Sequence, residues 1–387
     1  MQLQEYTGTA PVWWPKSWSA KLIGDPKFGA GTADVALESA LPGSGTMIPG
    51  GTLTAPLVFA GNTDAEGSVT VDVKGKVAVQ HLTPGSGAFS ERGRTAGRAR
   101  DMIGKGAVAV INVVEQTGNM FIRDFGNCGG PCFNVGAADG VFLEGAIAKA
   151  AQAGASGDLK IQMTLDAQTS TGLKGHNAIG IVPGRNTAEN IIVNAHGDGW
   201  FDAAGDNGDG FATVMALARH FARPENTPER TLVFVISGGH HSTGLNGPAN
   251  LVKMNPELTK KTVLVVNLEH IAQLYFRPAP WRVEAAEQPM NLGISNSSPA
   301  LIEIGKRARE RYGFAINPTF GTSTAGDLGG YEPLGVARVQ AIHAGPMYHA
   351  SGDVLESIST PGLERAARFF AYFVNEAART PRSAINP

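Results

Sequence analysis

The feature that most constrains the fold is a set of nearly all-apolar runs after Asn177, which alternate with segments of helical periodicity. The runs cover Glu189–Ala195, Thr231–Ser237, Val263–Leu268 and Val336–Ile342. Such runs form strands that are buried on both faces of a sheet. Apolar residues also recur at helical spacing over 211–221 and 363–377. The alternation predicts an α/β fold in which helices flank a mixed, mostly parallel sheet.

The region from about Gly50 to Gln168 has a different texture and predicts a separate, β-rich domain. Its short β-branched runs are bounded by Gly, Asp or Asn, as is usual for strands between turns. Strands are predicted at Leu57–Ala60, Val69–Val73, Lys76–Gln80 and Ala107–Val113, and a helix at Ser90–Ile103. Because His, Asp and Glu do not cluster here, we expect this domain to contribute no metal ligand.

The chain has 387 residues, more than the roughly 100–200 of one ordinary domain. We expect an N-terminal segment over 1–49 that packs on the catalytic domain, a β-rich domain over 50–168 and an α/β catalytic domain over 169–387. The first 45 residues read as irregular, with Trp13, Trp14 and Trp18 as packing anchors.

Charge and composition exclude several classes of partner. Lys and Arg number 32 against 34 Asp and Glu, a balance that argues against binding to nucleic acid or an anionic membrane. The opening Met1–Trp14 lacks the basic start and apolar run of a signal peptide, so we expect a cytoplasmic protein. For Cys128 and Cys132, two reduced thiols are the simpler interpretation and a small disulfide is the alternative. Two thiols alone would be a poor metal site.

Histidines and carboxylates follow the predicted strands. They are His196 and Asp198 after the first strand, His240 and His241 after the second, Glu269 and His270 after the third, and His343, His349 and Asp353 after the last. Ligands of open α/β sheets bind beyond the carboxyl ends of the strands. Imidazoles and carboxylates at one edge are what a divalent cation such as zinc requires. Asp198 is placed to orient the His196 imidazole.

Together these residues resemble the M28 family of zinc-dependent aminopeptidases. The resemblance rests on His196-Gly-Asp198, Asp206-Asn207, Arg230–Phe234 and Tyr348-His349, with Asp327–Tyr331 as a further family segment. The earlier region resembles the protease-associated (PA) domain of that family at Pro56–Gly61, Val73–Val77 and Gly104–Ile111. The two resemblances cover roughly residues 50 to 375.

The resemblance implies a site for one or two zinc ions. Asp206 would bridge both ions, His196 and Glu269 would complete one site, and His349 would complete the other. The family's usual Glu-Glu pair, a general base followed by a metal ligand, falls on His240-His241. The loop is one residue longer before Gly244, so an exchange of these two roles stays open.

Both replacements are chemically workable. His241 would bind metal as a neutral imidazole, and His240 would move protons, because its ordinary pKa of about 6.5 suits transfer near neutrality. Four further residues are candidates for the substrate pocket: Asp327, Tyr331, Arg277 and Trp281.

The sequence therefore predicts a metal-dependent hydrolase of an amide or related bond in a small molecule or short peptide, with a metal-activated water as nucleophile. Two alternatives remain open. Loss of the Glu pair also suits a metal-dependent lyase or isomerase in which His240 takes a proton from carbon. A non-catalytic binding protein with a vestigial metal site is the other alternative.

Overall fold

The computed structural model describes residues 1–24, 33–63, 69–83, 88–116, 118–123, 126–242, 244–279, 282–287, 289–342, 345 and 347–387, with the backbone alone over 88–94, 275–279 and 282–287. The chain divides into two compact units. Unit 1 comprises Met1–Val12, Thr171–Tyr348 and Asp353–Pro387, and unit 2 comprises Trp13–Ser170 and His349–Gly352.

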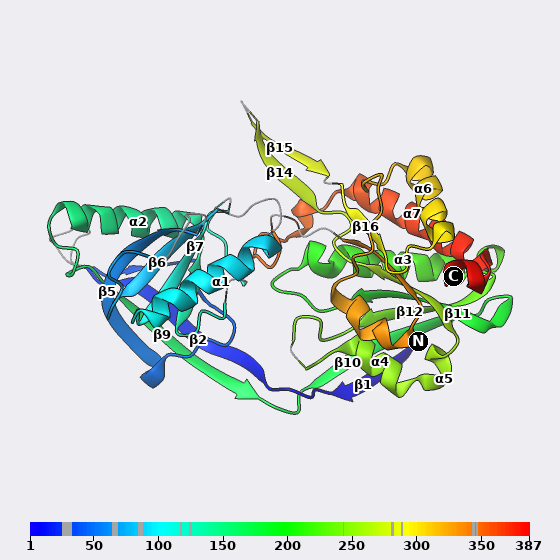
Figure 1. Ribbon diagram of the computed structural model, residues 1–387, viewed down its shortest axis with the longest axis horizontal. Helices are drawn as coiled ribbons and strands as arrows, with labels where there is room; N and C mark the ends of the chain where they lie inside the picture. Colours follow the sequence, from blue (N-terminus) through cyan, green and yellow to red (C-terminus); the bar gives the residue numbers. More distant parts are fainter. Residues whose placement is uncertain are drawn as a thin grey trace. The chain divides into compact units, whose positions relative to one another are not determined.

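Unit 1 is built on a seven-stranded sheet with the order β1-β10-β12-β11-β13-β17-β16 (Figure 1). The strands are β1 (Gln2–Thr7), β10 (Lys174–Val182), β11 (Asn186–His196), β12 (Arg230–Ser237), β13 (Thr262–Leu268), β16 (Asn291–Ile294) and β17 (Ala337–Ile342). The central four, β12, β11, β13 and β17, are mutually parallel, whereas β1, β10 and β16 pair antiparallel at the edges. The four apolar runs are thus confirmed as the parallel core of a mixed sheet.

Helices cover both faces of this sheet because its central strands are apolar on both sides. Ile191 and Val193 of β11 pack with α3 (Asp209–Phe221), α6 (Pro299–Tyr312) and α7 (Thr360–Arg379). Ile192, between them, packs on the opposite face with α4 (Gly247–Met254) and η5 (Gly326–Leu334). Two short helices, α5 (Pro256–Thr259) and α8 (Arg382–Ile385), and the hairpin β14 (Leu274–Ala279)–β15 (Arg282–Glu287) complete the unit.

Unit 2 contains an eight-stranded sheet with the order β3-β2-β9-β5-β6-β7-β8-β4. The strands are β2 (Val12–Leu22), β3 (Val35–Ala36), β4 (Leu41–Pro42), β5 (Thr52–Asn62), β6 (Val77–Leu82), β7 (Ala109–Val114), β8 (Cys132–Val135) and β9 (Lys160–Ser170). The helices α1 (Ala88–Gly104) and α2 (Ala137–Gln152) lie on opposite faces of it (Figure 1). Val110 of β7 packs with Met102 of α1, whereas Ile111 packs with Leu143 of α2.

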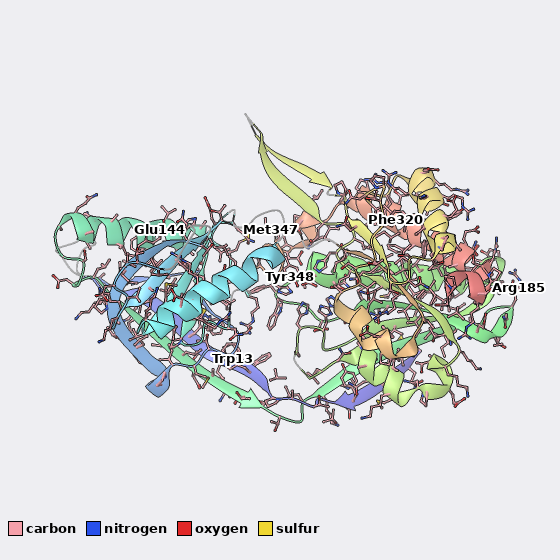
Figure 2. The ribbon with its side chains drawn as sticks, in the orientation of Figure 1. Trp13, Glu144, Arg185, Phe320, Met347 and Tyr348 are labelled. Atoms are coloured by element: carbon pink, nitrogen blue, oxygen red, sulfur yellow. A yellow bond between two sulfur atoms is a disulfide. The ribbon has the colours of Figure 1, made fainter. Side chains whose placement is uncertain are left out.

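The N-terminal segment differs from the prediction of one irregular piece over 1–49. Residues 1–12 belong to unit 1, where β1 pairs with β10, and the remainder belongs to unit 2. Trp13, labelled in Figure 2, lies near the start of β2 and donates from Nε1 to the Thr46 carbonyl over 2.9 Å. Trp18 donates likewise to Ala40 over 2.7 Å. Trp13 and Trp18 thus pack against the core of unit 2 as predicted, but from a strand. Trp14 does not, because it is 58% exposed.

Two other local expectations are wrong. Val69–Val73 forms no strand, although Val69 and Val73 are both buried against the face that α1 covers. Cys128 and Cys132 are joined by a disulfide, not left as reduced thiols. Among the helices of the described residues, none combines the length and apolar composition needed to cross a lipid bilayer.

Candidate metal centre

The parallel strands of unit 1 bring four of the predicted ligands to one edge of the sheet. His196 is the last residue of β11, His241 follows β12, and Glu269 directly follows β13. Asp206 comes from the short helical turn Ala204–Gly208 between β11 and α3. His196, Asp206 and Glu269 are no more than 3% exposed, so a group of charged and ligating atoms is buried together.

His196 shows most directly that the cluster suits a bound cation. Its Nδ1 lies 2.8 Å from the carbonyl oxygen of Asp198, so Nδ1 carries a proton and donates it. Nε2 lies 3.2 Å from Asp206 Oδ1 and 3.8 Å from Glu269 Oε1, yet has no hydrogen-bond partner among the described residues. In the neutral ring, Nε2 presents a lone pair to two carboxylates. That arrangement is stable only with a cation or an added proton between them, and the donor set suits zinc.

The pKa values of two histidines in the metal-free cluster also indicate that the cluster favours added positive charge. Burial opposes charging of His196, but the carboxylates of Asp206, Glu269 and Asp327 outweigh it and raise the pKa of His196 to about 10. Burial is likewise outweighed at His241, where Asp198 and Asp206 raise the pKa to about 9. Without a metal, protons therefore occupy imidazole nitrogens that face the carboxylates.

His240 lies against this cluster, and the Asp327 carboxylate holds its ring. Its Nδ1 lies 2.8 Å from Asp327 Oδ1, and its Nε2 lies 3.6 Å from Glu269 Oε1. The ring stacks on that of His196, with centroids 4.0 Å apart and an interplanar angle of 10°. Ligand atoms of His196, His240 and Glu269 lie within 4.8 Å of one another. His240 is therefore oriented to act on whatever the cluster binds.

Asp327 and Tyr331 support this arrangement from the interior of unit 1. Asp327 accepts hydrogen bonds from Asn194 Nδ2 over 2.9 Å and from the Ser237 hydroxyl, and Tyr331 donates to Asn194 Oδ1 over 2.9 Å. Asp327 is 4% exposed and Tyr331 is fully buried. The sequence predicted that Asp327 and Tyr331 line the substrate pocket. This prediction is wrong, because both side chains are turned inward and hydrogen-bonded there. Burial raises the pKa of Asp327, but His240 outweighs it and holds the pKa below its usual value.

Asp198 has a different role from the one predicted. Its carbonyl oxygen, not its carboxylate, accepts from His196. The carboxylate accepts the backbone N–H groups of His240 and His241 over 3.1 and 3.0 Å, and lies 3.4 Å from His241 Nδ1. His241 Nε2 in turn lies 3.1 Å from Asp206 Oδ2. Asp198 thus holds the His-His pair against the cluster, which the spacing to His196 alone did not reveal.

Two further residues near the cluster were not assigned a role from the sequence. The Asp353 carboxylate accepts from the backbone N–H groups of Gly205 and Asp206 over 2.8 and 2.9 Å and so fixes the Asp206 turn. His270 is 2% exposed, and its Nε2 lies 3.4 Å from Asp206 Oδ1. The signal for His270 was its place directly after Glu269, at the end of a buried strand.

A comparison with protein families identifies the fold that carries this cluster. A model described as peptidase family M28 matches residues 177–374, slightly more than half of the chain. The chain belongs to this family. The matched segment includes the four parallel strands of the M28 unit, and with them all the cluster residues described above.

Solved structures extend the likeness of this M28 protein to nearly the whole chain. The M28 peptidase precursor of Shewanella amazonensis SB2B is 19% identical, with a TM-score of 0.70, and the alignment covers 97% of this chain and 84% of that one. A zinc aminopeptidase of Bacillus subtilis is 21% identical, with a TM-score of 0.66 and coverage of 99% and 87%. An aminopeptidase of Aneurinibacillus sp. strain AM-1 is 21% identical, with a TM-score of 0.56 and coverage of 100% and 86%. At these identities the likeness establishes a shared fold. No curated protein sequence matches this chain.

For some predicted residues of the M28 site, the role stays a prediction. His349 belongs to unit 2, so its role as a ligand of a second ion stays a prediction. Trp281 and His343 lie outside the described residues, as does the side chain of Arg277. The PA resemblance of unit 2 also stays a prediction.

Proposed function

We propose that this M28 metallohydrolase cleaves an amide bond of a small molecule or short peptide, with a buried zinc ion and His240 as the proton-transferring group. The observation that supports this most is the position of His240, between the Asp327 carboxylate and the cluster of His196, Asp206 and Glu269. The named relatives include a zinc aminopeptidase, which makes aminoacyl amides the first substrates to test.

His196, Asp206 and Glu269 would hold the ion, since His196 Nε2 lies 3.2 Å from Asp206 Oδ1 and 3.8 Å from Glu269 Oε1. When bound, zinc supplies a Lewis acid that polarises a carbonyl oxygen and acidifies water. His241, against Asp206, is the proposed ligand of a second ion. Because His241 is neutral where the family's ligand is a carboxylate, the second ion would be held less tightly than the first.

His240 would take a proton and return it to the leaving nitrogen. Its Nδ1–H donates to Asp327, which leaves the Nε2 lone pair on the side of the cluster. This pairing fixes both the tautomer and the orientation of the ring, as in other histidine–carboxylate pairs. Asp198 holds the backbone of the same residue. A histidine of this chain would thus carry out the proton transfer for which the family uses a glutamate.

The test combines metal content with turnover. We expect His240→Ala to keep its zinc while turnover of aminoacyl and non-peptide amides falls by on the order of 10²–10⁴, the usual contribution of a general acid–base group. His220→Ala, which alters an exposed histidine on α3, is the matched control and should change neither quantity. Loss of zinc from His240→Ala would instead assign His240 as a metal ligand.

Turnover in ¹⁸O-labelled water distinguishes hydrolysis from the lyase or isomerase alternative. Hydrolysis of an amide places one labelled oxygen in the carboxylate product, whereas proton abstraction from carbon places none there. Turnover without incorporation of ¹⁸O would overturn the hydrolytic proposal. A protein that binds zinc but turns over no substrate in the panel would favour the binding-protein alternative.

A further inference from the structure

We propose that His270 is an additional ligand of the ion held by His196, Asp206 and Glu269. This inference rests on the proposed zinc site and goes beyond the ligand set that the M28 resemblance implies. It concerns a side chain of this chain that is buried against the two carboxylates of the cluster.

The distances place His270 in the same relation to the carboxylates as His196. Its Nε2 lies 3.4 Å from Asp206 Oδ1 and 3.7 Å from Glu269 Oε1. The matching distances from His196 Nε2 are 3.2 and 3.8 Å. A tetrahedral zinc with bonds of about 2.0–2.1 Å spaces its ligand atoms about 3.3–3.4 Å apart. Both imidazoles therefore approach the same two oxygens at close to the separation that ligands of one ion require.

The backbone explains how two consecutive residues reach one point. In an extended strand, successive side chains point to opposite faces, so Glu269 and its neighbour would normally diverge after β13. His270 has a φ of 54°, in the left-handed region. Few residues other than glycine and asparagine adopt this region readily, so a histidine there indicates that the position is held for a reason. Here the turn brings the His270 ring back to the carboxylates.

The His270 ring also packs against an aromatic side chain. Tyr348, labelled in Figure 2, packs against His270 with ring centroids 5.2 Å apart. At 2% exposure, His270 has lost nearly all contact with solvent. The ion proposed for His196 would also provide a partner for this buried imidazole beside two carboxylates.

An extra neutral ligand suits the charge of this cluster. Asp206 and Glu269 together balance the two positive charges of zinc, so a third carboxylate would leave the buried site with a net negative charge. His270 adds a donor without adding charge. With His196, Asp206, Glu269 and His270 as four protein ligands, a zinc ion that expands to five-coordinate keeps one position for water or substrate. His240 then stays available for proton transfer.

The experiment uses the full chain and zinc itself. His270→Asn is the main variant, because asparagine tolerates a left-handed backbone but is too short to reach the ion. Zinc affinity is measured by competition with a chromogenic chelator. X-ray absorption at the zinc edge, with zinc below one equivalent, counts the imidazoles bound. His220→Asn is the control for loss of an exposed histidine, and His270→Ala is a second variant in case the first folds poorly.

Loss of a residue that only hydrogen-bonds a ligand lowers metal affinity by about 10–100-fold. We expect a larger fall in zinc affinity in His270→Asn. The wild-type spectrum should contain two imidazoles, His240→Ala should keep both, and His270→Asn should keep one. An unchanged imidazole count in His270→Asn overturns this inference, whatever the change in affinity, while the zinc site stands. A wild-type chain that binds no zinc overturns the proposed function itself, and so the two failures are distinguishable.

Discussion

The two units bury polar side chains in different ways. In unit 1 the polar groups buried at the sheet edge include charged or titratable side chains, among them His196, Asp206 and Glu269. In unit 2 the buried polar groups of the sheet are the neutral amides of Gln80, Asn112 and Asn134, each with no exposed surface. Both units nevertheless consist of a sheet with helices on its two faces.

The amides of unit 2 are hydrogen-bonded in a row, although Gln80 Oε1 has no hydrogen-bond partner among the described residues. Gln80 Nε2 donates to Asn112 Oδ1 over 2.7 Å, Asn112 Nδ2 donates to Asn134 Oδ1 over 2.9 Å, and Asn134 Nδ2 donates to the Ile122 carbonyl over 2.9 Å. This row crosses β6, β7 and β8 and needs no outside charge. The cluster of unit 1 is not hydrogen-bonded in this way, because an imidazole lone pair of His196 faces carboxylate oxygens. The contrast assigns metal chemistry to unit 1 and a structural role to the polar row of unit 2.

The sharpest way to break this contrast is to remove the carboxylate on which three imidazoles converge. Asp206 lies 3.1–3.4 Å from Nε2 of His196, His241 and His270. We expect Asp206→Ala to lose its zinc and to reduce turnover below detection, since no other carboxylate occupies this position among the described residues. Zinc content and turnover are measured together, and an Asp206→Ala protein that retains both would contradict the assignment.

A smaller loss is expected behind His240. Asp327→Ala should lower kcat by about 10–100-fold with zinc retained, as is typical for a residue that orients another. Asp327→Asn keeps an acceptor for His240 Nδ1 and should recover part of the loss. An equal loss in both variants would point to general damage to the fold and not to orientation of His240.

The metal-free protein should lose stability as the pH rises. The folded pKa values of His196 and His241, about 10 and about 9, exceed the ordinary value of about 6.5. Their stabilisation is therefore fully present below about pH 6.5 and is lost as the pH rises through 9 and 10. Tm of the chelator-treated chain should fall across this range, and bound zinc should remove the fall. A Tm independent of pH above 6.5 would contradict the charged imidazoles.

Much of this cluster could be predicted from the order of strands and polar residues. The carboxyl ends of parallel strands meet at one edge, so His196, His241 and Glu269 had to lie close together. Asp206 followed from the family segment Asp206-Asn207. The role of Asp198 did not follow, because spacing along the chain favours His196, whereas the fold brings His240 and His241 to its carboxylate.

The remaining differences arise where local sequence is ambiguous. The burial of Asp327 and Tyr331 depends on packing of η5 against the sheet, which the family segment alone does not define. β2 was missed because a proline and two lysines interrupt its alternation, although three tryptophans mark it. β9 carries a signal that was overlooked, since Ile161, Met163 and Leu165 alternate and are all buried.

The smallest expected effect lies in unit 2. Asn112→Leu removes the central amide of the polar row and leaves Gln80 and Asn134 each without one partner. We expect a loss of about 1–3 kcal/mol in the free energy of unfolding of this unit. Zinc affinity and turnover should not change. Denaturation followed by fluorescence, beside a zinc titration, measures both, and a fall in zinc affinity would break the division of roles between the units.

The most direct test of the central claim is the zinc content of the full chain after incubation with zinc and exhaustive dialysis. The account predicts at least equimolar zinc in the wild type and in Asn112→Leu, and none in His196→Ala, which removes the imidazole whose Nε2 faces both carboxylates. A wild-type chain that retains no zinc, or a His196→Ala chain that retains as much as the wild type, would contradict it.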